Sequence, residues 1–291
     1  MSLETPGNIG PYRLLSIVNT GQTSRIWQAY HDRLQKRFAL KTLLSEYARN
    51  REHVHYLRWE YVVAGKLEHP NIIRVQEFNY DKGIPYLSLE WFLAPNLKQF
   101  LRQDRSQIDY LFPKIIHDGT EALTHFASFG WVHRDIKPDN VLVGPEGEVK
   151  LIDFALATKA KKGLARVFSR RSRVQGTRSY MSPEQILGKP LDERADLYSW
   201  ACTIFEVVCG RPPFTGFSGN ELLQKHLSAA VPNLEAFNRN ITPEFSKLVR
   251  SAMAKRPSQR PESIHGFRDA LKNTPIFRHT PRAPKHPAEN L

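Results

Sequence analysis

The stretch that decides the fold is residues 131–143, which read WVHRDIKPDNVLV. Charged residues and a proline lie between two apolar ends, and a second apolar run, VKLID, ends at Asp153. The apolar segments Val141–Val143 and 149–152 flank GPEGE, whose glycines and proline are typical of a turn. We therefore predict a β-hairpin, with Asn140 directly before its first strand and Asp153 directly after its second.

Both of these residues should lie at the open end of the hairpin, because paired strands are only about 4.8 Å apart. An amide oxygen and a carboxylate that converge in this way suit Mg²⁺, which uses few protein ligands. Asp135 lies in the loop upstream, which Pro138 keeps from becoming regular helix, and it can act there on a hydroxyl as a base. Each residue alone would be interpreted as a turn former, but the joint pattern favours a catalytic site.

The rest of the chain predicts an α+β fold. It has 291 residues, 41% hydrophobic and 24% charged, as in an ordinary globular protein of one large domain or two lobes. Residues 12–44 alternate like antiparallel strands, 49–67 have a helical period that ends before HPNII, and two short strands follow at 74–79 and 85–90. Longer helical patterns come next, over 97–103, 107–129, 183–187, 192–209, 219–228 and 243–254.

We therefore expect a small antiparallel β-rich N-lobe with one main helix, and a larger, mainly helical C-lobe. The N-lobe would cover about 12–90, the hinge about 90–96 and the C-lobe about 97–270. Residues 274–291 contain four prolines in eighteen positions, and we expect this basic tail to be disordered.

The formal charge of +13 is concentrated in residues 159–178 and in the tail from 278 onward. Such runs more often face solvent or a protein partner than DNA, and no recognition-helix or zinc-finger pattern accompanies them. We therefore expect no specific nucleic-acid partner.

The cysteines and the apolar runs indicate a compartment. Cys202 and Cys209 lie about 10 Å apart on a predicted helix, too far for a disulfide, which favours a reducing, cytoplasmic location. The longest apolar-rich stretch, 197–209, is too short for a membrane segment, and the first 30 residues lack a secretory signal.

Three motifs, HRDIKPDN from His133, DFA from Asp153 and GTRSYMSPE from Gly176, together closely resemble those of eukaryotic-type Ser/Thr protein kinases. The resemblance covers roughly residues 12–270, and general similarity of the large lobe suggests the bacterial members of this family. It implies a two-lobed fold with ATP between the lobes, and transfer of phosphate from ATP, with Mg²⁺, to Ser or Thr of protein substrates.

The resemblance also assigns roles to the residues of the opening stretch. Asp135 would orient or deprotonate the substrate hydroxyl, and Lys137 would neutralise the transferred phosphoryl group. Asn140 and Asp153 would hold Mg²⁺.

For the nucleotide, Lys41 in FALK matches the lysine that contacts the ATP phosphates, and Glu60 matches its ion-pair partner. Taken singly, both would be interpreted as solvated residues. Leu89 would be the gatekeeper. The other residues that the resemblance places at the nucleotide are Val18, Asn19, Gly21, Ser24, Ile26, Ala39, Glu90, Trp91, Phe92 and Leu142.

Three further positions have supporting roles in the resemblance. Glu184 and Arg260 would form a buried ion pair below the activation segment, and Asp196 would steady the catalytic loop.

Two departures from the family pattern concern the nucleotide. Asn19, Gly21 and Ser24 occupy the three glycine positions of the covering loop, although Asn tolerates positive φ and Ser is small. Ala155 replaces the glycine of D-F-G, which costs little at negative φ and about 1 kcal/mol or more at positive φ. The alternative is therefore a pseudokinase scaffold that binds nucleotide or partners without phosphoryl transfer. A small-molecule kinase is disfavoured by GTRSYMSPE, which resembles a peptide-binding platform.

The segment between the DFA and SPE motifs has eight positive charges and no negative one. Mutual repulsion predicts a mobile loop, and a phosphate on Ser169 or Ser172 could pair with neighbouring arginines and with Arg134. We hypothesise autophosphorylation at one of these serines, whereas Thr177 should pack and hydrogen-bond in the substrate platform. A docking surface for an acidic partner is the rival interpretation.

Overall fold

The computed structural model describes residues 7–160 and 175–284. The chain divides into two compact units. The N-lobe unit is Met1–Leu93 with Asp153–Ala155, and the C-lobe unit is Ala94–Ile152 with Leu156–Leu291. The division falls within the expected hinge, whereas Asp153 joins the first unit although its sequence position lies among C-lobe residues.

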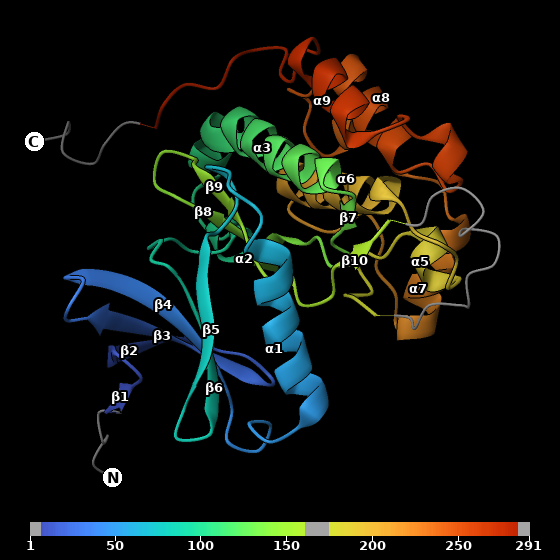
Figure 1. Cartoon of the computed structure of the whole chain (residues 1–291). Coiled ribbons are helices and arrows are strands. Elements are labelled where there is room, and N and C mark those ends of the chain that lie inside the picture. The colour runs from blue at the N-terminus through green and yellow to red at the C-terminus, as the bar shows by residue number, and fades with distance from the viewer. Residues whose placement is uncertain (1–6, 161–174, 285–291) are drawn as a thin grey trace, which may run out of the picture. The chain divides into compact units, whose positions relative to one another are not determined.

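The N-lobe unit is a six-stranded antiparallel sheet with one helix (Figure 1). The strand order is β1-β2-β3-β4-β6-β5. The strands are β1 (Asn8–Ile9), β2 (Tyr12–Thr20), β3 (Ser24–His31), β4 (Lys36–Leu43), β5 (Val75–Asp81) and β6 (Ile84–Glu90). The helix α1 (Arg51–Ala64) packs beside β5 and β6, and the Asn50 side chain caps its start by accepting from two backbone N–H groups.

The core of this sheet follows the period of two that its strands predict. Trp27 and Ala29 on β3 and Phe38 and Leu40 on β4 are all buried, and they alternate with more exposed neighbours. The Tyr12 hydroxyl joins this core by donating to Glu77 Oε1 at 2.8 Å.

The C-lobe unit is mainly helical, as predicted. Its helices are α2 (Leu97–Phe100), α3 (Arg105–Ser128), α5 (Pro183–Ile186), α6 (Glu193–Cys209), α7 (Gly219–Ser228), α8 (Pro243–Ala252) and α9 (Ile264–Lys272). Its short strands are β7 (Trp131–Val132), β8 (Val141–Val143), β9 (Val149–Leu151) and β10 (Thr158–Lys159), and 3₁₀ turns cover Pro138–Asn140, Leu234–Ala236 and Pro257–Gln259. The α+β prediction is therefore confirmed.

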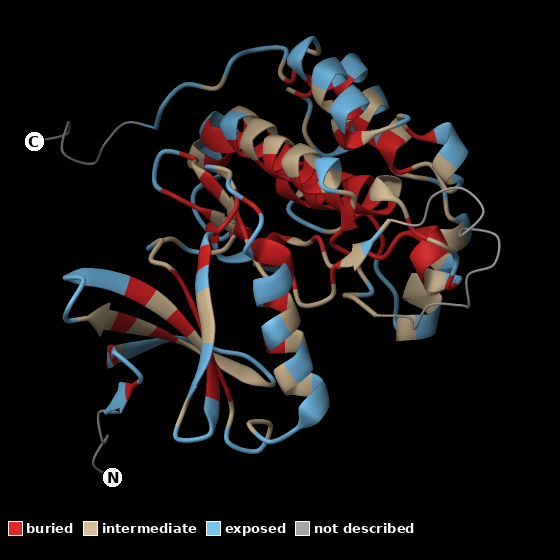
Figure 2. Cartoon of the chain, viewed as in Figure 1, coloured by how far each residue is buried: buried red, intermediate tan, exposed pale blue. Residues whose placement is uncertain are grey.

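Helix α6 is the centre of this unit and is buried along most of its length (Figure 2). It packs closely on α3 at Gly119, where an added Cβ would lie 2.4 Å from the Trp200 ring. The Trp200 indole donates to Thr120 Oγ1 at 2.9 Å. In the described residues, no helix combines the length and the apolar character needed to cross a bilayer.

Two features of the C-terminal region were not predicted. Helix α9 was not predicted, although Ser263 caps it and Ile264, Phe267 and Leu271 have helical spacing and are buried. The expectation of disorder is wrong for the start of the tail, because Ile276 is buried. Backbone bonds join this segment to the one before α8: Thr242 N to Ile276 O (3.1 Å) and Arg278 N to Asn240 O (2.7 Å).

The apolar residues Ile and Phe of TPIF give this short segment a surface to bury, which its proline-rich and basic composition obscured.

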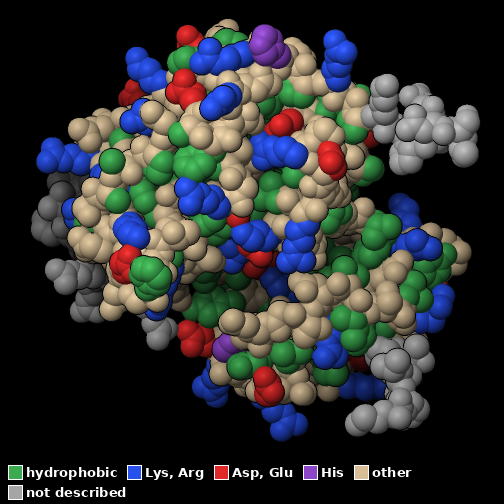
Figure 3. All heavy atoms as spheres, turned by 180° about the vertical axis from the view of Figure 1, so that it is seen from behind, with side chains coloured by type: hydrophobic (Ala, Val, Ile, Leu, Met, Phe, Trp, Pro, Cys, Tyr) green, Lys and Arg blue, Asp and Glu red, His purple; other side chains and the backbone are tan. Residues whose placement is uncertain are grey.

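On the face shown in Figure 3, Lys and Arg side chains are spread over much of the surface, in keeping with the net charge of +13.

Candidate active site

The predicted hairpin is present, and its ends carry the two expected oxygen donors. Val141 pairs with Leu151 in the β8–β9 register, and the Ile152 N–H donates to the Asn140 carbonyl at 3.0 Å. Asp153 is the next residue and has a φ of 67°, a backbone conformation that residues other than glycine rarely adopt. Such strain is often found at functional positions.

Asp135 is held by hydrogen bonds on both of its carboxylate oxygens. Thr177 donates to Oδ1 through its backbone N–H at 2.8 Å and its hydroxyl at 2.9 Å. Lys137 Nζ donates to Oδ2 at 2.7 Å and also to Thr177 Oγ1 at 2.8 Å. Asn140 Nδ2 donates to the Asp135 carbonyl at 2.8 Å, with a weaker 3.3 Å contact to Oδ2.

These contacts bring together Asp135, Lys137, Asn140 and Thr177. The sequence predicts that Thr177 packs and hydrogen-bonds, but its hydrogen bonds to the Asp135 carboxylate were not predicted. The two positions are 42 residues apart, and no local pattern in the sequence links them.

The backbone that presents Asp135 is fixed from below. Asp196, which is buried, accepts from the backbone N–H groups of His133 at 2.6 Å and Arg134 at 2.9 Å. Burial raises the pKa of Asp196 to about 7, and these two hydrogen bonds oppose that rise. Gln185 Nε2 donates to the Arg134 carbonyl at 2.7 Å. A Cβ at Gly176 would lie 2.7 Å from the same carbonyl oxygen, so glycine is required there.

In the N-lobe unit, Lys41 lies between two carboxylates. Its Nζ is 2.6 Å from Glu60 Oε2 and 3.2 Å from Asp153 Oδ1. Burial by itself lowers the pKa of Lys41, but Asp153 and Glu60 outweigh this effect and raise it. The ammonium group is therefore charged at neutral pH and can neutralise a phosphate.

Strand register places four of the expected nucleotide residues on one face of the sheet. Ala39 and Lys41 are two apart on β4; Ala39 pairs with Leu89, and Lys41 pairs with Ile26. Cross-strand partners share a face, so Lys41 lies among three apolar side chains. A cation beside three apolar side chains can bind a ligand that joins a flat apolar ring to an anionic group.

The covering loop and the hinge lie at the ends of this sheet. Val18, at an irregularity of the β2–β3 pairing, is 51% exposed; Asn19 and Gly21 are also exposed, and Ser24 is half-buried. The Glu90 N–H donates to the Arg74 carbonyl at 2.9 Å, so Glu90 could contact adenine only through its carbonyl oxygen.

The remaining hinge and floor positions are half-buried. Trp91 and Phe92 follow β6 in the N-lobe unit. Leu142 lies on β8 of the C-lobe unit, where it forms a β-bridge with Asn96.

Ala155 is compatible with its backbone position. The described non-glycine residues with positive φ are Gln35, Lys82, Arg134 and Asp153, and Ala155 is not among them. The replacement of glycine by alanine therefore adds no left-handed strain.

The expected supporting ion pair is present in the C-lobe unit. Arg260 donates to both Glu184 oxygens, at 2.7 and 2.8 Å, and both side chains are buried. Arg134 is also buried. Ser169 and Ser172 lie outside the described residues.

Asn140 in the C-lobe unit and Asp153 in the N-lobe unit each carry side-chain oxygen atoms, which are the ligands that Mg²⁺ prefers. Within the described residues, no group of three or more His, Cys, Asp or Glu side chains could hold a metal ion. Asn140 donates its Nδ2 to the Asp135 carbonyl, so the Oδ1 of Asn140 points away from that contact. The Asp153 side chain is 39% exposed, so its carboxylate is accessible to an ion. Mg²⁺ needs only one or two such oxygens and takes the others from water and phosphate.

The two units and their charged residues are those of a kinase fold. Residues 12–274 match the family described as Protein kinase domain. The chain belongs to this family.

Several curated relatives come from bacteria. The chain is 32% identical over 271 residues to a probable serine/threonine-protein kinase of Streptomyces coelicolor, covering 91% of this chain and 40% of that protein. It is 31% identical over 284 residues to PknA of Mycobacterium tuberculosis, covering 96% and 64%. The chain thus spans 40% to 64% of the length of these two relatives.

A solved structure shows the same fold. The kinase domain of Mycobacterium tuberculosis PknI has a TM-score of 0.68 and 21% identity, and the match covers 94% of this chain and 99% of that one.

Proposed function

We propose that this chain transfers the γ-phosphoryl group of Mg-ATP to serine or threonine hydroxyls of proteins. The main support for the proposal is that the Asp135 carboxylate accepts hydrogen bonds from Lys137 and from both the backbone N–H and the hydroxyl of Thr177. A carboxylate fixed in this way can orient a hydroxyl and take its proton. The substrate class is supported by relatives whose names are serine/threonine-protein kinase.

Among the described residues, the 3.3 Å contact from Asn140 is the longest hydrogen bond to the Asp135 carboxylate. We therefore assign Oδ2 to the substrate hydroxyl, which would displace that contact. Lys137 lies 2.7 Å from the same oxygen, so its positive charge would act where negative charge develops on the phosphoryl group. The proton of the hydroxyl passes to Asp135, and its oxygen bonds to phosphorus as ADP leaves.

For the nucleotide, we assign the phosphates to Lys41, which Glu60 holds in place at 2.6 Å. The apolar side chains of Ile26, Ala39 and Leu89 would contact adenine. Val18, Asn19, Gly21 and Ser24 would cover the phosphates, Glu90 and Phe92 would contact adenine from the hinge, and Leu142 would complete the site.

Asn140 and Asp153 are the oxygen donors that we propose for Mg²⁺. When bound, the ion would neutralise phosphate charge. We also propose that Ser169 or Ser172 is autophosphorylated and that Arg134 helps to receive the phosphate. A reducing, cytoplasmic location is supported by Cys202 and Cys209, which are both unpaired.

A pseudokinase scaffold is the second candidate, and the covering loop with Gly21 as its single glycine is the observation in its favour. Transfer of phosphate decides between the two. We expect radiolabelled ATP to label a generic protein substrate with the parent chain. Lys41→Met and Asp135→Asn should each lower the rate by about 100-fold or more, because each removes a group required at the transition state. Equal labelling by all three proteins would rule out this catalytic assignment.

A further inference from the structure

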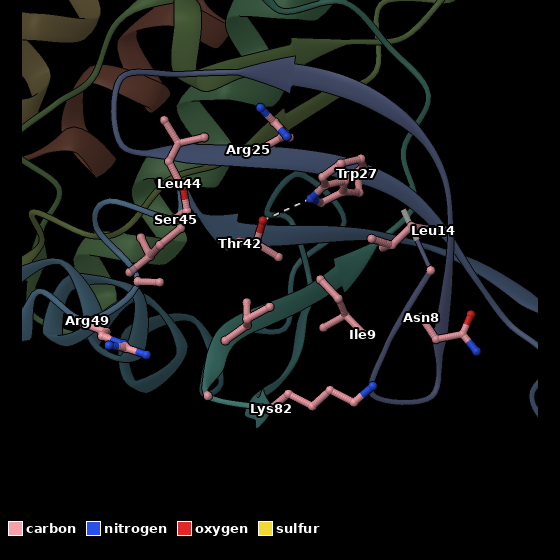
Figure 4. Close-up of a pocket in the computed structure, with 15 residues that line it drawn as sticks. Asn8, Ile9, Leu14, Arg25, Trp27, Thr42, Leu44, Ser45, Arg49 and Lys82 are labelled. Carbon is pink, nitrogen blue, oxygen red and sulfur yellow. Dashed lines mark hydrogen bonds between the residues drawn. The ribbon is translucent and has the colours of Figure 1, made fainter. Parts of the chain in front are cut away.

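A hollow lies in the N-lobe unit (Figure 4), and its lining contains none of the residues that we propose for the nucleotide. It has a volume of about 570 Å³, and its lining comes from β1, β2, β3, β4, the segment before α1 and the β5–β6 turn. Arg25, Trp27 and Thr42 contribute to this lining, whereas Lys41, Glu60 and Asp153 do not.

Strand alternation separates this hollow from the nucleotide face. Trp27 and Thr42 are the neighbours of Ile26 and Lys41 on β3 and β4, so their side chains lie on the opposite face of the sheet. The Trp27 indole donates to Thr42 Oγ1 at 3.0 Å, as the dashed line in Figure 4 shows. The hollow is therefore a distinct site on the other side of the sheet.

The charge of this lining has one sign. It includes Arg25, Arg49 and Lys82 and no Asp or Glu side chain. Among the described residues, none of these three cations forms an ion pair with a carboxylate. Three uncompensated cations around one hollow create a positive potential that attracts anions.

Arg25 has in addition an unused donor. Its Nε is buried and has no hydrogen-bond partner among the described residues, and its guanidinium carbon lies 5.2 Å from the centre of the Trp27 ring. A buried N–H without an acceptor is costly, so an acceptor at this position would stabilise the unit.

Besides the cations and the polar residues Asn8, Thr42 and Ser45, the lining includes several apolar side chains. Ile9, Leu14 and Trp27 are buried at the hollow, and Figure 4 shows Trp27 beside Arg25 and Ile9 above Lys82. The volume is in the range that holds a small organic molecule. An inorganic anion alone would leave most of this surface uncovered.

We propose that this hollow binds a small amphipathic anion, with a phosphate or carboxylate group on Arg25 and an apolar body packed on Trp27 and Leu14. Arg49 and Lys82 add electrostatic attraction. The site is independent of the nucleotide.

The test uses 1-naphthyl phosphate as the probe, with titration calorimetry on the whole chain. We expect it to bind at least about tenfold more tightly than either inorganic phosphate or 1-naphthol, because each comparator lacks one half of the recognition. Equal affinity for either comparator would overturn the proposal.

Variants locate the binding. Arg25→Gln should weaken the affinity for 1-naphthyl phosphate by about tenfold or more, since it removes a charged hydrogen-bond donor. Arg37→Gln makes the same change at an exposed position of β4 that is outside the lining and on the other face of the sheet, and it should leave the affinity within about twofold. Lys41→Met should likewise retain binding. An unaffected Arg25→Gln, or binding lost in Lys41→Met, would contradict the assignment.

If Arg25→Gln does not fold, the double variant Arg49→Gln/Lys82→Gln gives a second test at exposed positions. The double variant should weaken the affinity for 1-naphthyl phosphate by about threefold or more, because it removes electrostatic attraction. Unchanged affinity would also contradict the proposal.

Discussion

The most informative single residue is Thr177, because two of its donors fix one oxygen of Asp135 and its hydroxyl also accepts from Lys137. Its backbone bond survives substitution of the side chain, whereas its hydroxyl bonds do not. Thr177 therefore acts by positioning the two charged groups that we propose for phosphoryl transfer.

We expect Thr177→Val to lower kcat by about 10- to 100-fold, since it removes hydrogen bonds to two charged groups and keeps the side-chain shape. Thr177→Ser is the matched control, because it keeps the hydroxyl, and its rate should remain near that of the parent. Steady-state kinetics with a peptide substrate measure both, and a parent-like rate for the valine variant would refute the positioning role.

How far the sequence predicts this site differs from residue to residue. Lys41, Glu60 and Asp153 come together as the motif resemblance implies, since the charged chemistry of the family demands those residue types. The link between Thr177 and Asp135 depends on a fold that no local pattern encodes. The free-energy cost of alanine at position 155 depends on the sign of its φ, which the sequence alone does not give.

At the scale of elements, the Glu184–Arg260 pair joins α5 to the segment that follows α8. Both side chains are buried, and Arg260 also donates to the backbone carbonyls of Ala254 and Arg194. The pair connects chain segments 76 residues apart beneath the proposed substrate platform.

Arg260→Met should lower the free energy of unfolding by about 3 to 5 kcal/mol, because it leaves the Glu184 carboxylate buried without its partner. Adding Glu184→Leu to that variant should recover part of the loss, since no buried charge remains. Urea denaturation measures both proteins. A double variant less stable than the single one would contradict this explanation.

The activation segment is the element whose modification we propose. Phosphopeptide mapping after incubation with Mg-ATP should find phosphate on Ser169 or Ser172, and the double variant Ser169→Ala/Ser172→Ala should remove it. An active enzyme with an unmodified segment would disprove the hypothesis. Salt-sensitive binding of that enzyme to an acidic protein would then support the docking interpretation.

Among the elements, strong periodicity and caps made most helices predictable. Helices were predicted over 192–209, 219–228 and 243–254, and α6, α7 and α8 lie there. Helix α9 had a capping serine and an apolar stripe and could have been predicted. The ordered start of the tail, around Ile276, depends on backbone hydrogen bonds with the segment before α8, which composition cannot show.

At the scale of the whole molecule, the stability of the chain should depend on pH through His226. Its side chain is buried against Phe214 and near Tyr198, and burial, together with Lys255, lowers its pKa from 6.5 to about 4. The unfolded chain therefore binds a proton between pH 6.5 and 4 that the folded chain does not.

We expect this residue to reduce the free energy of unfolding by about 3 kcal/mol as the pH falls from 6.5 to 4, with no contribution above 6.5. His226→Gln removes the titrating group, so the stability difference between parent and variant should shrink over that range. Thermal or urea unfolding at a series of pH values measures it, and a difference independent of pH would contradict the shifted pKa.

The central claim is that the Asp135 carboxylate carries phosphoryl transfer to a protein hydroxyl. The most direct test is kcat/KM for Asp135→Asn against Asp139→Asn, which makes the same change at an exposed position of the same loop. We predict a loss of about 100-fold or more for Asp135→Asn and less than about threefold for Asp139→Asn. Equal rates in the two variants, with both proteins folded, would contradict the account.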